Sequence, residues 1–294
     1  MQYISELITD KTPILHLKND RSTTTEEKEN VLGKIRACLS KKEEYLQMLY
    51  LMNNSWYYLK KEEDNPSYPF YLINELMGSY IVKSRGLKTP DYFIAETKKN
   101  KGIASLNFKQ EGYDYYFGDY FHHRYKELTG GYLILSVDGI ADLSILCQSP
   151  EKKQKLIDDF INMLAIDTYM LQTDRGPANI QFAVNQKTKE AQLGPIYDFS
   201  NCSTAILSSG LFLKNCIVLL VDNNIRLLVQ KYPEYKEYLS FLIEQGFVST
   251  WNQICDDYHF NKNNDAYESV LEYYKMKEQS QKNYLSKFIG KKFI

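Results

Sequence analysis

The pattern of apolar and polar positions in the first 110 residues predicts several short strands and one amphipathic helix. The apolar run Pro13–Leu17 is typical of a strand. Over Tyr71–Arg85 the apolar residues recur at the i, i+3, i+4, i+7 and i+8 spacing of one helical face, and Gly86 is a natural stop. Two further apolar runs, Tyr92–Ala95 and Ile103–Phe108, flank a polar turn and predict two strands.

Residues 20–60 leave two interpretations open. Thr25 precedes acidic residues and is expected to cap a helix that runs through Leu39. Beyond it, the apolar runs Tyr45–Met52 and Ser55–Lys60 are separated by two asparagines. Because asparagine tolerates left-handed backbone geometry, this arrangement indicates a hairpin. A helix through residues 32–52 is the alternative, and the pattern alone does not decide between the two.

The pattern of apolar and polar residues changes in the second half of the chain. Residues 111–150 are aromatic and irregular, without a clear period. The sequence Ser149-Pro150 followed by an acid predicts a helix start, and apolar spacing extends this helix to about Leu171. A polar loop and two short strands, Asn179–Val184 and Ala191–Ile196, are expected next.

The C-terminal third is expected to be helical from about residue 204. The clearest helices are predicted over Glu234–Gln245 and Ala266–Lys282. The most apolar run, Ala205–Val221, carries Lys214 and Asn215 in its middle and is short for a membrane span of about 20 residues. We therefore interpret it as a buried helix and expect no transmembrane segment.

Composition narrows the class of protein. Of the 294 residues 44% are apolar and 25% are charged, which argues against global disorder. The formal net charge is −1, so nothing in the charge predicts direct nucleic-acid binding. The five cysteines are scattered without a CxxC pair, which argues against a disulfide framework or a zinc site. The first residues lack a basic and an apolar region, so we expect a cytoplasmic protein, with signal-free export into a host left open.

Three polar side chains near the end of the long central helix are of the types that phosphoryl transfer needs. Asp174 follows the helix, Asn179 comes five residues later, and the predicted hairpin leads to Asp198 and Phe199. One carboxylate orients or deprotonates the acceptor hydroxyl, while an amide and a second carboxylate hold Mg²⁺ against the ATP phosphates. Taken singly, each has a plain structural alternative: a loop acid paired with Arg175, a turn residue and a helix cap.

This segment resembles the HipA-like serine/threonine kinases, and within them the helicobacter cell-translocating kinase type. The resemblance rests on Asp174-Arg175-x-x-x-Asn179, a strand, and then Pro195–Phe199. Two further stretches, Asn74–Pro90 and Trp56–Lys60, look like the small-lobe helix of that family and the strand that carries its ATP-binding lysine. Phosphoinositide kinases share a similar loop, so a lipid kinase remains an alternative.

The resemblance implies an α+β fold of the two-lobed, protein-kinase-like (HipA-like) type. A small α/β N-lobe that binds nucleotide would cover residues 1–110, and a mainly helical C-lobe with the catalytic loop and the metal site would cover residues 111–294. The hinge between them is expected near residues 107–112.

The resemblance also implies a role for each site residue. Lys60 would contact the α- and β-phosphates of ATP, and Glu75 would hold it by an ion pair. Asp174 would be the catalytic acid, and Asn179 and Asp198 would bind Mg²⁺. For Lys60 the alternative is a solvated pair with its neighbour Lys61, and for Glu75 it is a surface salt bridge.

Three features depart from the family pattern, the first being Gly176-Pro177 in place of the His or other polar residues that often follow Asp-Arg in the family. No glycine-rich phosphate loop precedes Lys60, and the polar stretch with Ser22 and Thr23 is the only loop-like candidate for binding phosphate or for being phosphorylated. Ser200 stands where protein kinases have the glycine of their Asp-Phe-Gly motif. A pseudokinase or binding module is therefore a further alternative.

The expected activity is transfer of the γ-phosphate of ATP to Ser or Thr hydroxyls of a protein, with Mg²⁺ as cofactor and autophosphorylation as a further outcome. A toxin–antitoxin or effector role follows from the same resemblance, with an antitoxin-like partner. We expect the Asp167 carboxylate, on the apolar helix seven residues before Asp174, to be partly buried and to support the catalytic loop.

Overall fold

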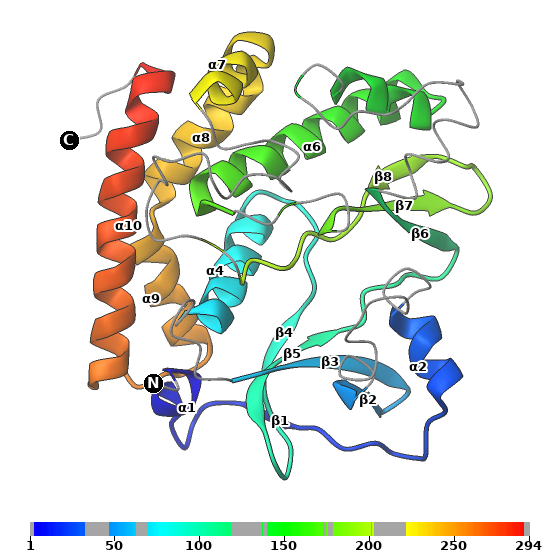
Figure 1. Ribbon diagram of the computed structural model, residues 1–294, viewed down its shortest axis with the longest axis vertical. Coiled ribbons are helices and arrows are strands. Elements are labelled where there is room, and N and C mark those ends of the chain that lie inside the picture. The colour runs from blue at the N-terminus through cyan, green and yellow to red at the C-terminus, as the bar shows by residue number, and fades with distance from the viewer. Residues whose placement is uncertain are drawn as a thin grey trace.

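Two small β-sheets lie on one side of a group of helices in the computed structural model (Figure 1). The structure describes residues 3–32, 47–62, 70–118, 137, 140–172, 175, 179–200, 202 and 222–290. The expected helix Ala205–Val221 and the expected catalytic Asp174 therefore lie outside the described residues. Within the described parts, no helix combines the length and the apolar character that a membrane crossing needs.

The first sheet has five strands in the order β1–β4–β5–β3–β2. Only the β1–β4 pair is parallel, and the other three pairs are antiparallel. These strands confirm the apolar runs expected in the first 110 residues. Their bounds are β1 Ile14–His16, β2 Leu49–Met52, β3 Ser55–Lys61, β4 Tyr92–Glu96 and β5 Lys101–Leu106.

Strands β2 and β3 form a hairpin, which settles the alternative left open by the sequence. Asn53 and Asn54 have φ angles of 50° and 59°, the left-handed geometry that a two-residue hairpin turn requires. The chain after β1 returns to the free edge of β2, where the Asp20 amide donates to the Leu51 carbonyl at 2.9 Å and Asn19 Oδ1 accepts from the Leu51 amide at 2.8 Å. The sheet is thus curled, and it encloses a small core around Leu59.

Helix α2, Thr25–Leu32, begins one residue earlier than the sequence pattern indicated. Its cap is Thr24 rather than Thr25, because the Thr24 hydroxyl accepts from the Glu27 amide at 3.1 Å while the Glu27 carboxylate accepts from the Thr24 amide at 2.8 Å. This reciprocal pair satisfies two amides at the helix start.

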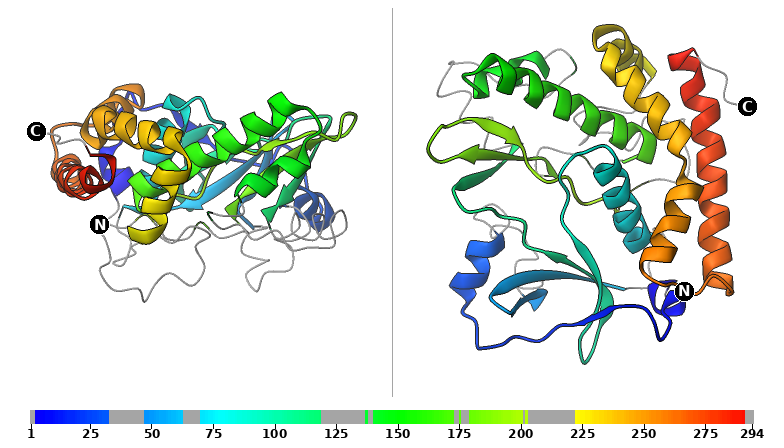
Figure 2. Two further views of the ribbon diagram at one scale, coloured as in Figure 1. Left: turned by 90° about the horizontal axis from the view of Figure 1, so that it is seen from above. Right: turned by 180° about the vertical axis from the view of Figure 1, so that it is seen from behind.

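Helix α4, Tyr71–Ser84, lies between the first sheet and the large helices (Figure 2, right). It matches the predicted helix, and Gly86 follows with a φ of 70°. Because α4 contacts the first sheet as well as helices α6 and α9, ten of its fourteen residues are buried, including the polar Asn74, Glu75 and Ser79. A helix buried this way holds its side chains in fixed positions relative to both lobes.

The N-terminal helix α1, Tyr3–Leu7, connects the first sheet to the helices. The Glu62 carboxylate at the end of β3 accepts from the Ile4 and Ser5 amides. The Leu7 carbonyl accepts from the Asn261 amide at 2.8 Å. The chain terminus thus contacts both parts of the molecule.

The second sheet has the order β6–β7–β8 and is antiparallel. Strands β7, Gln181–Asn185, and β8, Ala191–Leu193, are the predicted hairpin. Strand β6, Tyr113–Phe117, corrects the expectation of an irregular region there. The aromatic residues of β6 lie on both faces of the strand, so its sequence does not alternate between apolar and polar residues. Its pairing partner β7 lies far along the chain.

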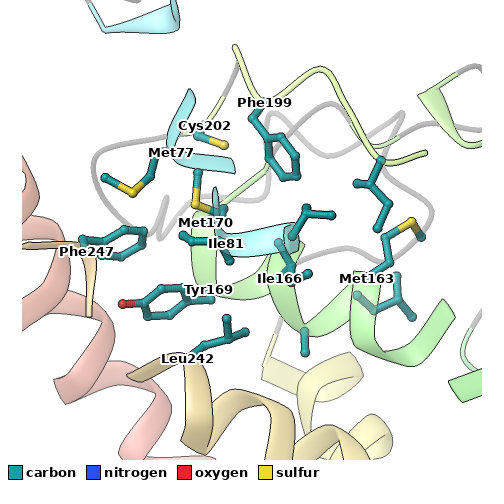
Figure 3. Close-up of a cluster of buried hydrophobic side chains, with 14 of the residues drawn as sticks. Met77, Ile81, Met163, Ile166, Tyr169, Met170, Phe199, Cys202, Leu242 and Phe247 are labelled. Atoms are coloured by element: carbon teal, nitrogen blue, oxygen red, sulfur yellow. The ribbon is translucent and has the colours of Figure 1, made fainter. Parts of the chain in front are cut away.

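Helices form the remainder of the described chain. Ser149 caps α6, accepting from the Lys152 amide at 3.2 Å, as the Ser149-Pro150 signal predicted. The large core lies where α4, α6, α8 and α9 meet, with Phe199 and Cys202 beside it (Figure 3). The bounds are η2 (a 3₁₀ helix) Ile140–Leu146, α6 Pro150–Met170, α7 Asp222–Lys231, α8 Pro233–Gln245, α9 Phe247–Asp257 and α10 Asp265–Ile289.

Candidate active site between the sheet and the helices

Lys60 on β3 meets two carboxylates that come from distant parts of the chain. Its ammonium group contacts Glu75 Oε1 on α4 and lies 2.7 Å from Asp198 Oδ1. The Lys60 side chain as a whole is 23% exposed, so most of it is covered by the surrounding protein. Because side chains alternate along a strand, the neighbouring Lys61 lies on the other face of the sheet. Lys60 is therefore the lysine that meets the two carboxylates.

Glu75 is fully buried, so the alternative of a surface salt bridge is wrong. Its Oε1 accepts from Lys60, and its Oε2 accepts from the Tyr92 hydroxyl of β4 at 3.1 Å. A buried carboxylate is stable only when such partners replace water. The structure thus supplies a cation for one oxygen of Glu75 and a hydroxyl for the other.

The two carboxylates govern the charge of Lys60. Burial alone would lower the pKa of the Lys60 ammonium, but Asp198 and Glu75 offset this effect and hold its pKa above the ordinary value. Lys60 is therefore a permanent cation at neutral pH.

Asp198 follows the second sheet in an unusual backbone conformation. Its φ is 67°, in the left-handed region that favours glycine, so the surrounding structure must compensate. The side-chain amide of Gln172 donates to the Asp198 carbonyl, and the Ser200 hydroxyl donates to Asp198 Oδ1 at 3.0 Å. An isolated antiparallel β-bridge between Gln172 and Cys202 connects the end of α6 to the segment that follows Asp198.

Arg175 joins the chain segments that carry the two expected metal ligands. Its Nη1 donates to the Asn179 carbonyl at 3.0 Å and to the Tyr197 carbonyl, just before Asp198, at 2.6 Å. Nε and Nη2 donate to the Asp167 carboxylate at 3.0–3.2 Å. One guanidinium group thus fixes both segments next to each other.

The Asp167–Arg175 pair is buried, with side-chain exposures of 6% and 4%. Burial raises the pKa of the Asp167 carboxyl although Arg175 opposes the rise. Burial would lower the pKa of Arg175, but Asp167 more than offsets it and the net pKa is raised. The expectation that Asp167 supports the loop agrees with this geometry, and its partner is the arginine of the Asp-Arg motif.

Phe199 packs directly against the backbone of α4. A Cβ added at Gly78 would lie 2.8 Å from Phe199 Cε2 and closer still to Cγ and Cδ2, so only glycine fits there. The guanidinium carbon of Arg175 lies 5.0 Å from the centre of the ring, and Phe199 is 1% exposed. The residue after Asp198 is therefore held between α4 and Arg175.

The structure brings Lys60, Glu75 and Asp198 into direct contact, and it brings Asn179 near Asp198 through Arg175. The roles assigned to these residues stay predictions. The position of Asp174, expected between Arg175 and the helix end, is outside the described residues.

Ser22 and Thr23 are not brought to Lys60 by any contact among the described residues. The Asp20 amide pairs with Leu51, which lies opposite Trp56. Lys60 stands four residues further along β3, on the order of 13 Å at the rise of a strand. Phosphate binding by Ser22 and Thr23 remains a prediction.

The donor set at this site fits Mg²⁺ and the phosphates of ATP. Asn179 and Asp198 would offer oxygen atoms, the ligands that a hard cation prefers, and two protein ligands suffice because Mg²⁺ retains water and phosphate. Within the described residues no group of three or more His, Cys, Asp or Glu side chains is placed to hold a metal ion. Lys60 would supply the cation for the phosphates.

Sequence reasoning missed Tyr92 and Gln172, which fix Glu75 and Asp198 respectively. No local signal marks either residue, because each reaches its partner across the fold. Arg175 is different: it lies inside the recognised motif, and its buried position explains why an arginine follows Asp174 there.

No protein-family model and no curated protein matches this sequence. Two solved structures are similar in fold. The Helicobacter pylori proinflammatory kinase CtkA has a TM-score of 0.51 and 15% identity, over 79% of this chain and 86% of that one. A chain of the Shewanella oneidensis MR-1 toxin–antitoxin complex of HipA, HipB and operator DNA has a TM-score of 0.55 and 10% identity, over 82% of this chain and 61% of that one.

At such low identity the similarity shows the fold. The two-lobed α+β fold expected from the sequence is confirmed, and the resemblance to HipA-like kinases is confirmed at that level.

Proposed function

We propose that this chain, which has the fold of HipA-like kinases, is an ATP- and Mg²⁺-dependent kinase that transfers the γ-phosphate to Ser or Thr hydroxyls of a protein. The observation that carries the proposal is the contact of Lys60 with both Glu75 and Asp198. These residues are separated by up to 138 positions in the sequence, and a cluster of partly covered charged groups around a buried carboxylate is typical of functional sites.

Each residue has a defined task in the proposed reaction. Glu75 orients the Lys60 ammonium, which would bind the α- and β-phosphates. Asp198 and Asn179 would hold Mg²⁺, which supplies neutralisation of the charge that develops on the transferred group. Asp174 would orient or deprotonate the acceptor hydroxyl. Arg175 and Asp167 keep the ligand-bearing segments in register, because positioning is most of what a protein contributes to phosphoryl transfer.

A protein partner of antitoxin type is part of the proposal. Its support is that one structural neighbour comes from a complex with HipB. Autophosphorylation would be detected as label on the kinase itself, and a protein acceptor as label on a second chain.

The test uses purified wild-type protein and two variants. Asp198→Asn keeps the shape of the side chain and removes its charge, so we expect transfer of radiolabel from ATP to fall at least a thousandfold while the melting temperature stays near that of the wild type. Lys60→Met should weaken ATP binding at least tenfold. Because a ligand that binds the native state must raise its melting temperature, a thermal-shift series with ATP and Mg²⁺ measures binding directly.

Full transfer activity in Asp198→Asn would refute the assigned role of Asp198. Binding of ATP without any transfer, with protein and lipid acceptors both present, would identify a pseudokinase. Label on phosphoinositide in place of protein would redirect the proposal to a lipid kinase.

A further inference from the structure

Tyr92, the first residue of β4, lies at the centre of a chain of hydrogen bonds that leads from the helices to the candidate site. Its hydroxyl donates to Glu75 Oε2 at 3.1 Å. Its carbonyl accepts from the hydroxyl of Tyr258, which follows α9, at 2.8 Å. Glu75 in turn contacts Lys60, and Lys60 contacts Asp198.

Glu75 depends on this hydroxyl because no water reaches it. The side chain is 0% exposed. Among the described residues, Lys60 is the only donor to Oε1 and Tyr92 is the only donor to Oε2. Because each oxygen is engaged by a different donor, the carboxylate cannot rotate without losing a partner.

We propose that Tyr92 is a positioning residue for the nucleotide-binding pair: it fixes the Glu75 carboxylate so that Glu75 presents Lys60 toward the phosphates. This inference rests on the proposed function and adds to it a residue that touches neither nucleotide nor metal.

The chemistry of Tyr92 suits this task. Burial, with the Glu75 carboxylate in addition, holds the pKa of the Tyr92 hydroxyl well above its usual range. The hydroxyl therefore remains a donor over the whole pH range in which a kinase works. Tyr92 is 8% exposed and packs in the large core, so substitution by phenylalanine removes the hydroxyl and leaves the packing in place.

A double-mutant cycle without nucleotide tests the contact itself. Tyr92→Phe leaves a buried carboxylate oxygen without a donor, so we expect the folding equilibrium constant to fall about 5- to 100-fold. In the Glu75→Leu background the hydroxyl has already lost its acceptor, and the same substitution should cost less than threefold. Equal effects in the two backgrounds, measured by urea unfolding, would overturn the proposal.

Kinetics test the effect on the nucleotide. We expect Tyr92→Phe to raise the KM for ATP about tenfold and to change kcat less than threefold, at a temperature where the variant is fully folded. The matched control is Tyr80→Phe on α4. Its hydroxyl donates to Asp257 Oδ2 at 2.8 Å and does not contact Glu75, Lys60 or Asp198, so this variant should leave the KM for ATP within twofold of the wild-type value.

A purely structural role would lower the melting temperature of Tyr92→Phe without changing the KM, and that result would overturn the proposal. A wild-type chain that neither binds ATP nor transfers phosphate would refute the proposed function instead. In that case the unfolding cycle, which needs no nucleotide, still decides whether Tyr92 holds Glu75.

Discussion

The substitution Gly78→Ala, which adds a single methyl group, is expected to disturb the candidate active site through Phe199, the residue next to Asp198. Gly78 lies in the middle of α4, and the Phe199 ring occupies the space where its Cβ would be. The ring cannot move away freely, because it is 1% exposed and the guanidinium group of Arg175 lies on it at 5.0 Å. The Gly78→Ala variant must therefore push Phe199, and with it the adjoining Asp198, or push α4.

Two opposing effects set the magnitude. Replacing glycine by alanine inside a helix stabilises by about 1 kcal/mol. Inserting a methyl group into a filled core costs about 1–3 kcal/mol, and this site is at the upper end because several ring atoms are overlapped. We expect a net loss of about 1–2 kcal/mol in the free energy of unfolding, the opposite sign to helix propensity alone. A displacement of about 1 Å near the reacting groups would lower phosphate transfer by about 100-fold.

Urea unfolding and radiolabel transfer measure the two effects. The double variant Gly78→Ala with Phe199→Leu is the matched control, because the smaller side chain leaves room for the methyl group. The double variant should recover part of the stability lost by Gly78→Ala, so that the two substitutions are not additive. If Gly78→Ala is about 1 kcal/mol more stable than the wild type and fully active, the packing argument is wrong.

Two further predictions concern buried charges. Asp167→Ala leaves Arg175 buried without its carboxylate, so the free energy of unfolding should fall by about 3–5 kcal/mol in urea titrations, and a loss below 1 kcal/mol would contradict this reasoning. Lys277 on α10 is 1% exposed, and burial lowers its pKa to about 8 from an ordinary 10.5. Below pH 8 its protonation opposes folding, while the rings of Phe247 and Tyr273, with centres 5.4 and 5.6 Å from its ammonium nitrogen, offset part of the cost. Lys277→Met should therefore be more stable than the wild type at pH 7, by about 1–2 kcal/mol. That advantage should shrink as the pH rises from 8 to 10.5, and a constant difference would refute the assignment.

Local sequence signals predicted those elements that depend on neighbours in the chain. The 3.6-residue period gave α4, the Ser149-Pro150 pair gave the start of α6, and the two asparagines favoured the β2–β3 hairpin. Strand β6 was missed because its residues are aromatic on both faces and the residues with which it pairs lie 64 to 72 positions away. The cap of α2 was misplaced by one residue, since three threonines in succession offer the same hydroxyl.

At the candidate site, the sequence identified residue types and spacing. Lys60, Glu75, Asn179 and Asp198 were all proposed from motif order, and the structure brings Lys60 into contact with Glu75 and Asp198. Tyr92 could not be found this way, because its contact with Glu75 exists only after β4 has joined the sheet next to α4.

The sequence by itself determined where most helices and strands form and which oxygen and nitrogen groups are available for chemistry, since both depend on short-range spacing. Only the tertiary structure decided which of two adjacent lysines meets the carboxylates, that Asp198 is held in a left-handed conformation, and that Arg175 pairs with Asp167. The physical reason is burial. Once water is excluded, each charged or polar group must find a partner, and that partner is supplied by the packing of distant segments.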